Sequence, residues 1–256
     1  MTTRYQVSLN NNQLDAVDSR IVVTDIQYPE PQIVPTLDAR GGTDGAVVSR
    51  WFRQKASVTV SFIINAYGIA DRNEVLQKII KWAMAGGVLR TNDRTGQRLS
   101  HAVADQLPAM RAKHWTEELT LTFSDYAFPY WENDTEITLS LAAGTDQSGS
   151  ITVDGNARQT YLTGAITAKA SVTWIKIITS MSTVYLTGLN LSNGDVVNIG
   201  YDSGMNLTIM NGTTSLLDKR TGDSADELLI PIGTNMVMVQ ASGNVESSIK
   251  ARGCWI

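Results

Sequence analysis

Residues 57–87 read SVTVSFIINAYGIADRNEVLQKIIKWAMAGG, and two hydrophobic periodicities meet within this stretch. In residues 57–64, apolar side chains alternate with Ser and Thr, which is typical of a strand with one buried face. Further on, apolar side chains recur every three or four positions, which indicates an amphipathic helix of about four turns. We expect Asp71 to cap this helix with Glu74 in the capping-box position, and Gly86 and Gly87 to end it.

Other segments of the first half supply a sheet for this helix to cover. Residues 115–123 alternate in the same way as residues 57–64. Shorter apolar segments at 5–9, 21–26, 46–52 and 98–101 are weaker strand candidates. Since one helix must bury its apolar face against some other element, the first half is predicted to be an α+β domain made mostly of strands.

The composition changes near residue 133. Residues 1–133 hold 14 basic and 14 acidic residues, a net charge of zero, whereas the remainder holds 7 and 11, a net charge of −4. The second part is rich in Thr, Ser, Gly and Asn, and its short apolar runs are separated by Asp154-Gly155, Asn193-Gly194 and Asn211-Gly212, which favour tight hairpin turns. We therefore predict two domains, 1–133 and 134–256, the second an all-β sandwich or jelly roll.

The overall composition restricts the possible functions. The 256-residue chain carries a net charge of −4, which disfavours a dedicated nucleic-acid binder. A single cysteine, Cys254, excludes a disulfide framework. No apolar run is long enough for a membrane span, and no secretion signal is expected at the N-terminus.

The sequence contains no recognisable catalytic motif. The nucleophile elbow, the zinc-protease helix and the phosphate-binding loop with its lysine are all missing. His101 and His114 have no carboxylate cluster at ligand spacing, and Cys254 has no nearby histidine. We therefore expect no enzymatic activity, no metal site and no cofactor.

Two segments are candidates for binding. The loop Arg40-Gly41-Gly42-Thr43-Asp44-Gly45 fits either a plain glycine-rich turn or a contact loop between subunits. In the second domain, Trp174 and Tyr185, together with Tyr201, could form a platform on which sugar rings stack. The alternative interpretation of Trp174 is an ordinary core residue.

The order of several segments resembles the distal tail proteins of siphophage-type long-tailed phages. In the first part these segments are VVTDIQYPEPQIV (22–34), RGGTDGA (40–46), WFR (51–53), SVTVSFII (57–64), WAMAGG (82–87), WTEELTLTF (115–123) and PYW (129–131). In the second part they are GDVVNI (194–199), LTIMNG (207–212), LLIPIGTN (228–235) and IKARGCWI (249–256). The resemblance implies an N-terminal ring-forming domain and a C-terminal galectin-like β-sandwich, in a mainly β protein with one amphipathic helix.

The same resemblance implies a structural function. Proteins of this family form a hexameric ring at the distal end of the tail tube and connect it to tail-tip, baseplate and host-recognition proteins. This implies a virion protein, made in the bacterial cytoplasm, whose ring DNA may cross without specific binding. For the subunit contacts we single out Arg40, Gly41, Gly42, Asp44, Gly45, Arg50, Trp51 and Arg53, since Arg and Trp often dominate interfaces. The alternative function is binding of host cell-surface glycans by the sandwich, through Trp174 and Tyr185.

Overall fold

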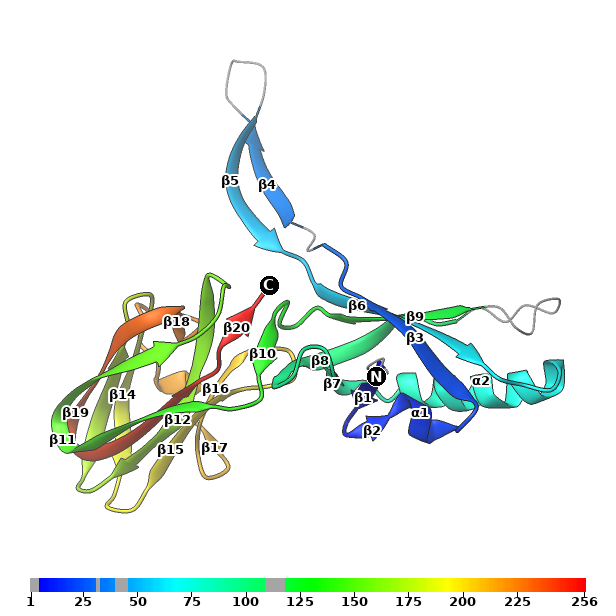
Figure 1. The fold of residues 1–256 in the computed structure, drawn as a ribbon. Helices are drawn as coiled ribbons and strands as arrows, with labels where there is room; N and C mark the ends of the chain where they lie inside the picture. Colours follow the sequence, from blue (N-terminus) through cyan, green and yellow to red (C-terminus); the bar gives the residue numbers. More distant parts are fainter. Residues whose placement is uncertain (1–4, 31–32, 40–45, 109–117) are drawn as a thin grey trace. The chain divides into compact units, whose positions relative to one another are not determined.

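The computed structural model describes residues 5–30, 33–39, 46–108 and 118–256, without the side chains of residues 33, 38–39 and 46–52. It divides into two compact units, which we describe separately: unit 1 (Met1–Glu132, with Ile256) and unit 2 (Asn133–Trp255). Both consist mainly of β-strands, and the one long helix belongs to unit 1 (Figure 1). The predicted fold class, mainly β with one amphipathic helix, is confirmed.

Unit 1 is an antiparallel sheet with one helix packed on it. Its elements are β1 (Val7–Leu9), β2 (Asn12–Gln13), α1 (Leu14–Val17), β3 (Ile21–Gln27), β4 (Ile33–Ala39), β5 (Ala46–Arg53), β6 (Ala56–Ile64), α2 (Ile69–Ala83), β7 (Gly87–Thr91), β8 (Gln97–Gln106), β9 (Leu119–Asp125) and β10 (Trp131–Asn133). The main sheet has the order β2-β1-β7-β8-β9-β6-β3. Strands far apart in sequence are therefore neighbours, as in the pair β6 and β9.

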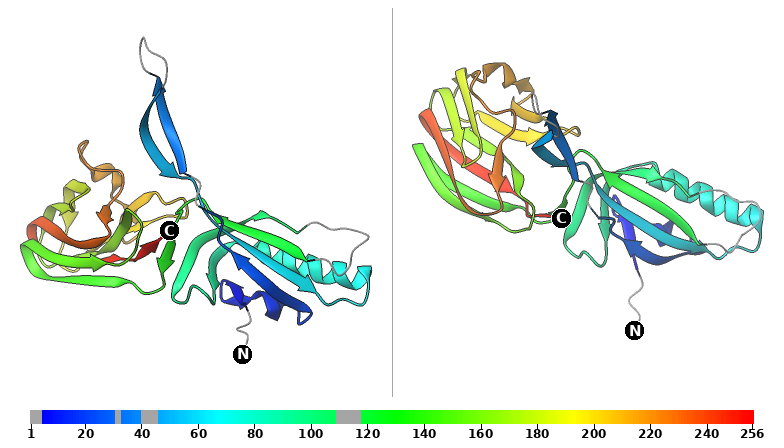
Figure 2. Two further views of the ribbon diagram at one scale, coloured as in Figure 1. Left: turned by 45° about the horizontal axis from the view of Figure 1, so that its top comes forward. Right: turned by 90° about the horizontal axis from the view of Figure 1, so that it is seen from above.

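The two faces of this sheet differ in chemistry because side chains alternate along each strand. One face carries Val58, Val60 and Phe62 of β6, all fully buried. Helix α2 covers this face (Figure 2), and its Trp82 ring meets Phe123 of β9 edge-on at 5.7 Å. Each such fully buried apolar side chain stabilises the unit by about 1.5–3 kcal/mol.

The opposite face carries hydroxyl groups, which we call the hydroxyl face. Across the β6–β9 pair, the hydroxyls of Ser57 and Ser124 lie 2.9 Å apart and those of Thr59 and Thr122 lie 3.1 Å apart. These contacts use uncharged groups that hydrogen-bond to one another. The alternation predicted from residues 57–64 thus separates an apolar face from a polar one, on which Ser124 also donates to the Asp105 carboxylate at 3.0 Å and Asp105 pairs with Lys55.

Helix α2 begins three residues earlier than predicted. Its first residue is Ile69 and its N-cap is Gly68, so the capping box of Asp71 and Glu74 is wrong. Asp71 lies inside the first turn, where its carboxylate instead accepts a hydrogen bond from the backbone N–H of Tyr67 at 3.0 Å. The predicted end is confirmed: Gly86 follows the helix with φ of 58°, a left-handed conformation that glycine adopts readily.

Strands β4 and β5 form a separate two-stranded hairpin. They pair antiparallel with each other from Ile33↔Arg53 to Ala39↔Ala46, and neither belongs to the main sheet of unit 1. In Figures 1 and 2 the hairpin extends away from that sheet. A hairpin with no further strand partner among the described residues has little of its own to stabilise it.

Unit 2 is a sandwich of curled antiparallel sheets. Its elements are β11 (Ile137–Val153), β12 (Gln159–Ala168), β13 (Val172–Ile178), β14 (Thr183–Leu191), β15 (Val196–Tyr201), β16 (Leu207–Asn211), β17 (Thr214–Ser215), the 3-10 turn η1 (Leu217–Lys219), β18 (Leu229–Pro231), β19 (Gly233–Ala251) and β20 (Cys254–Trp255). The strand order is β14-β13-β19-β12-β15-β16-β17, and β11 also pairs with β19. Inward-facing side chains such as Ile166, Ile177, Val197 and Val239 form one core.

The two longest strands bend together. The register between β11 and β19 shifts twice, between Leu141 and Gly144 and again before Asp146. At this bulge the side chain of Gln147 is buried and donates hydrogen bonds to the carbonyls of Ala142 and Val245. Its own carbonyl accepts from the Ser247 hydroxyl at 2.7 Å. One amide therefore satisfies backbone groups that the bulge removes from the strand ladder.

Two of the three glycine turns predicted in unit 2 are tight Asn-Gly turns, whereas the third makes a different contact. Gly194 and Gly212 have φ of 95° and 58°, as tight turns at Asn-Gly require. The Asp154-Gly155 pair is different: Gly155 pairs with Cys254 in a parallel bridge. A Cβ at position 155 would lie 2.1 Å from the Cys254 carbonyl oxygen, so only glycine permits this approach. Hairpin chemistry alone could not predict this contact with the end of the chain.

Candidate functional site

The predicted subunit-contact residues fall into three groups. Arg40, Gly41, Gly42, Asp44 and Gly45 lie outside the described residues. Arg50 and Trp51 lie in β5, where their backbones pair with Thr36 and Pro35 of β4. Arg53 ends β5 at the base of the hairpin, and its side chain is described.

The guanidinium of Arg53 is poorly satisfied where it lies. It stacks over the ring of Tyr130, with its central carbon 5.5 Å from the ring centroid. Its Nε and Nη1 atoms are buried without a hydrogen-bond acceptor among the described residues. Burial, and to a smaller extent the positive charge of Arg94, lowers the pKa of Arg53. Buried donors usually have acceptors, so this arginine is suited to receive one from beyond the described residues.

Arg94 belongs to a second aromatic contact. Its guanidinium carbon lies 4.5 Å from the ring centroid of Tyr28 and 4.9 Å from that of Trp131. The Tyr28 hydroxyl donates to the Asp93 carboxylate at 2.6 Å, and burial raises the pKa of this phenol. The segment 22–34, which contains Tyr28, and the segment 129–131 were both noted in the sequence, but nothing in a single sequence links them to each other or to Arg94.

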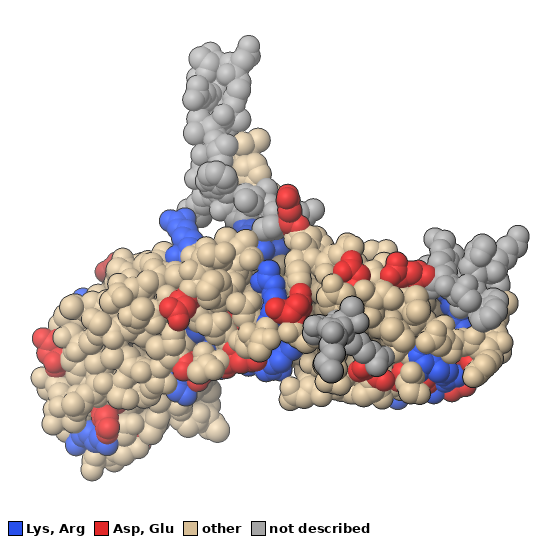
Figure 3. Space-filling model, viewed as in Figure 1, with Lys and Arg blue, Asp and Glu red and all other residues tan. Residues whose placement is uncertain are grey.

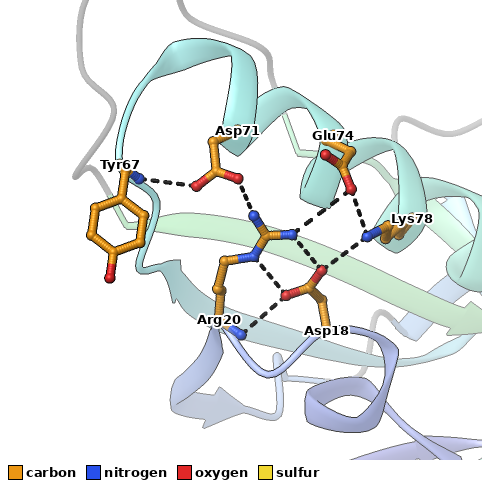
Figure 4. A network of polar contacts seen from close by, with 6 residues as sticks. All are labelled: Asp18, Arg20, Tyr67, Asp71, Glu74 and Lys78. Carbon is orange, nitrogen blue, oxygen red and sulfur yellow. Dashed lines mark hydrogen bonds and ion pairs between the residues drawn. The ribbon is translucent and has the colours of Figure 1, made fainter.

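A network of charged groups joins the start of β3 to α2 (Figure 4). The Asp18 carboxylate accepts hydrogen bonds from Arg20 Nε at 2.8 Å and from Lys78 Nζ at 3.1 Å. The hydrogen bond from Arg20 is the main reason why the pKa of Asp18 lies far below its ordinary value. Lys78 also pairs with Glu74 at 2.8 Å, one turn earlier on α2.

The same network reaches the turn between β6 and α2. Arg20 forms an ion pair with Asp71, and the other oxygen of Asp71 accepts the backbone N–H of Tyr67. The position of this turn is therefore fixed by side chains of α2 and of the segment that precedes β3. The Tyr67 ring itself takes no part and points away from the network (Figure 4).

The sugar-binding candidates of unit 2 do come together. Trp174 of β13 and Tyr185 of β14 are both half-buried, and their rings meet edge-on at 5.9 Å with an interplanar angle of 85°. Lys176 Nζ lies 5.8 Å from the centroid of the Tyr185 ring. Two rings at right angles present no common flat face. Tyr201 contacts Tyr161 instead, at 4.6 Å.

The remaining reactive side chains have structural surroundings. His101 Nδ1 lies 3.7 Å from the buried carboxylate of Asp125, which raises the pKa of the histidine, while His114 lies outside the described residues. Cys254 is buried, with its sulfur 3.1 Å from the Thr160 hydroxyl. In the described part of the chain, no three side chains of metal-ligand type cluster together, and no helix has the length and apolar character to span a membrane.

The fold alone defines a class of protein. It consists of an α+β unit with an extended hairpin, followed by a β-sandwich. Its likeness to one solved structure extends over the whole chain. The Dit protein of phage SPP1, a paradigm of the hub adsorption apparatus in phages that infect Gram-positive bacteria, superposes with a TM-score of 0.71. The match covers 99% of this chain and 100% of that one at 13% identity.

Weaker likenesses complete the comparison. Two structures of the activated phage P2 baseplate, one with calcium and one with strontium, contain chains that match with TM-scores of 0.43 and 0.45. Both are 10% identical to this chain, over 99% of its length in the first and 96% in the second. No family model and no curated protein sequence matches significantly. The predicted resemblance to siphophage distal tail proteins is thus confirmed at the level of the fold.

Proposed function

We propose that this chain is a structural hub protein of a phage tail tip. The observation that carries this proposal is the fold shared with the SPP1 Dit protein over the full length of both chains. A shared fold does not by itself define a function. Here, however, both units match in one continuous chain, and the surfaces described above are suited to assembly.

The first of these surfaces is the β4–β5 hairpin with Arg53 at its base. A hairpin that pairs with no other described strand offers its free edges to a second chain. Arg53 adds two buried donors that have no acceptor among the described residues. A carboxylate or carbonyl from a neighbouring subunit would satisfy them. This arrangement supports the sequence-based choice of Arg53 as a contact residue.

The second surface is the outer strand of the main sheet. β3 pairs with β6 on one side, and it ends the strand order of that sheet. Edge strands leave backbone donors and acceptors available for pairing. Pairing of this strand with an unlike edge of the next copy would be a heterologous contact, which closes a ring when the rotation permits. We infer a ring of six copies in the virion, between the tail tube and the tail-tip proteins.

A ring at this position would have to let DNA pass without holding it. Unit 1 has no net charge by composition, and the charged groups beside its hydroxyl face, Lys55 and Asp105, are paired with each other. In the described part of the face drawn in Figure 3, basic and acidic side chains lie interspersed. DNA adhesion depends on clusters of Lys and Arg that replace counterions. We therefore assign the hydroxyl face to the wall of the passage.

Light scattering of the purified chain after size-exclusion chromatography tests this proposal. We expect a mass of six chains, or an approach to six as the concentration rises. The same measurement in the presence of the tail tube protein from the same phage serves as the second arm. A single-chain mass under both conditions would count against the ring.

A further inference from the structure

The turn between β6 and α2 exposes an aromatic side chain to solvent. Tyr67 is 97% exposed, and Ile69, two residues later, is 45% exposed. Most exposed apolar side chains in a protein need no explanation, but a nearly free tyrosine beside a second apolar residue is unusual. We call Tyr67 and Ile69 the knob.

The knob is held in place rather than loosely attached. The backbone N–H of Tyr67 donates to Asp71, and Asp71 is held in turn by Arg20. Arg20 is fixed by Asp18, which also accepts from Lys78 (Figure 4). Ordering a loop on binding lowers affinity, so a turn that is already fixed loses less on contact with a partner.

The same unit carries a groove on the other half of α2. Its volume is about 470 Å³, and its lining includes Leu9 of β1, Ala16 and Val17 of α1, and Trp82 and Ala85 in and after α2. Trp82 is fixed there because its indole N–H donates to the Asn12 carbonyl at 3.0 Å. The lining is thus mainly apolar and partly rigid, as sites that accept an aromatic ring usually are.

The charges beside the two features have opposite signs. Asp71 and Glu74 follow the knob in the first part of α2, and the Glu74 side chain is 62% exposed. Lys78 and Lys81 border the groove. Lys81 is exposed and has no ion pair among the described residues. Asp71 is already paired with Arg20, and Lys78 with Glu74 and Asp18, so the charges that can complement each other between copies are those of the exposed Glu74 beside the knob and of Lys81 beside the groove.

The knob and the groove of one molecule cannot meet. α2 has 15 residues, which gives a length of about 22 Å, and the two features lie beside opposite halves of it. We propose that the knob of one copy of this chain occupies the groove of the next, in a head-to-tail contact. This inference rests on the proposed ring and specifies one of its contacts, since a closed ring requires two unlike patches on each subunit.

A pair of complementary variants tests the direction of this contact. Tyr67→Ser removes the knob, and Ala85→Glu fills the groove with a charge that repels Asp71 and Glu74 of the neighbour. Each alone should weaken self-association by about tenfold or more. Mixed in equal amounts, they should form a two-chain species and nothing larger, since each such pair retains one intact contact. Tyr5→Ser, which removes another exposed tyrosine of unit 1, is the matched control.

Cross-linking provides a second measurement that does not depend on ring size. In the Tyr67→Cys/Ala85→Cys double variant, a short bismaleimide should join separate chains. The wild-type chain should give no product, because its Cys254 is buried. A product from Tyr67→Cys alone would indicate a symmetric contact and overturn the head-to-tail inference. Monomer only from the double variant would also overturn it.

The two experiments test the knob–groove contact and the six-copy ring independently of each other. If the wild-type chain reaches six copies but the double variant does not cross-link, the proposed function stands and this contact is wrong. If the double variant cross-links but the wild-type mass never approaches six, the contact stands and the hexamer is wrong. Thermal unfolding of each variant shows whether the fold is intact before either result is interpreted.

Discussion

At the scale of single residues, Arg53 shows how an unsatisfied group can indicate a contact. Its guanidinium has a favourable stacking partner in Tyr130, but two of its nitrogens are buried without an acceptor among the described residues. Burial of a charge without full pairing lowers the stability of the fold. Such a residue is retained when it has another function. Because Arg53 lies at the base of the β4–β5 hairpin, we propose that subunit contact is this function.

Replacement of Arg53 by Met should therefore separate folding from assembly. The free energy of unfolding of the monomer should be unchanged or about 1 kcal/mol higher, because an apolar side chain needs no acceptor. Self-association should weaken. Urea unfolding and light scattering measure the two effects, with Arg158→Met, an exposed arginine of unit 2, as the control. A variant that assembles like the wild type would show that Arg53 makes no subunit contact.

Asp18 leads to a prediction about pH. The pKa of its carboxyl is lowered from an ordinary value of 3.8, chiefly by the hydrogen bond from Arg20. A lowered pKa in the folded state stabilises the fold at pH values above 3.8, and this contribution is lost as the pH falls below that value. Asp18→Asn should thus be less stable than the wild type near neutral pH, and the difference should shrink at about pH 2.5.

Urea midpoints at several pH values measure this difference. Asp223→Asn, at an exposed aspartate of unit 2, controls for the loss of one negative charge. A gap between the wild type and Asp18→Asn that is the same at neutral and acidic pH would contradict the assignment. The same network holds the knob in place. Loosening it by Asp18→Asn should therefore also weaken self-association.

At the scale of elements, local patterns predicted what local interactions determine. Strand β6 and the end of α2 follow from alternation and from glycine, because a half-buried strand and a left-handed turn leave direct traces in the sequence. The predicted start of α2 was wrong. Asp71 is of a residue type that often caps helices, but here it forms an ion pair with Arg20 from another segment. Arg72, a charged residue of α2, is 1% exposed, which the periodicity of the helix does not indicate.

The candidate site was less predictable than the fold. Arg53 could be chosen by residue type, but its partner Tyr130 lies 77 positions away (130 − 53). The network of Asp18, Arg20 and Asp71 likewise depends on packing between β3 and α2. Exposure of Tyr67 has no counterpart in the sequence, where tyrosine usually indicates a strand or a core position. These features arise only when distant segments fold together.

The bend shared by β11 and β19 depends on a single amide. Gln147 satisfies the carbonyls of Ala142 and Val245 and accepts from Ser247. Gln147→Met keeps the side-chain length but leaves these groups unsatisfied, which should destabilise the protein by about 2 kcal/mol. Urea unfolding measures the change. Gln240→Met, at a more exposed glutamine of β19, should change stability by less than about 0.5 kcal/mol, and equal effects of the two would contradict this role.

At the scale of the whole molecule, the charge balance bears on what the proposed ring can contain. The chain carries 21 basic and 25 acidic residues, and the hydroxyl face presents neutral groups from β6 and β9. Phosphate contacts depend on clustered cations and weaken steeply with salt. A wall of Ser and Thr hydroxyls gives DNA nothing to hold at a fixed position.

The hydroxyl face can be converted into a DNA-binding surface by one exposed position. Thr120 of β9 alternates with Thr122 on this face, so Thr120→Lys would place six new cations around a ring of six. Wild-type protein should not retard duplex DNA in a gel at about 50 mM salt, whereas Thr120→Lys should retard it and lose the effect as salt rises. Thr120→Glu, which changes the same position with the opposite charge, should behave like the wild type. Salt-sensitive retardation by the wild type would show that a basic surface of the protein binds DNA. The assignment of the hydroxyl face to the passage would then be wrong.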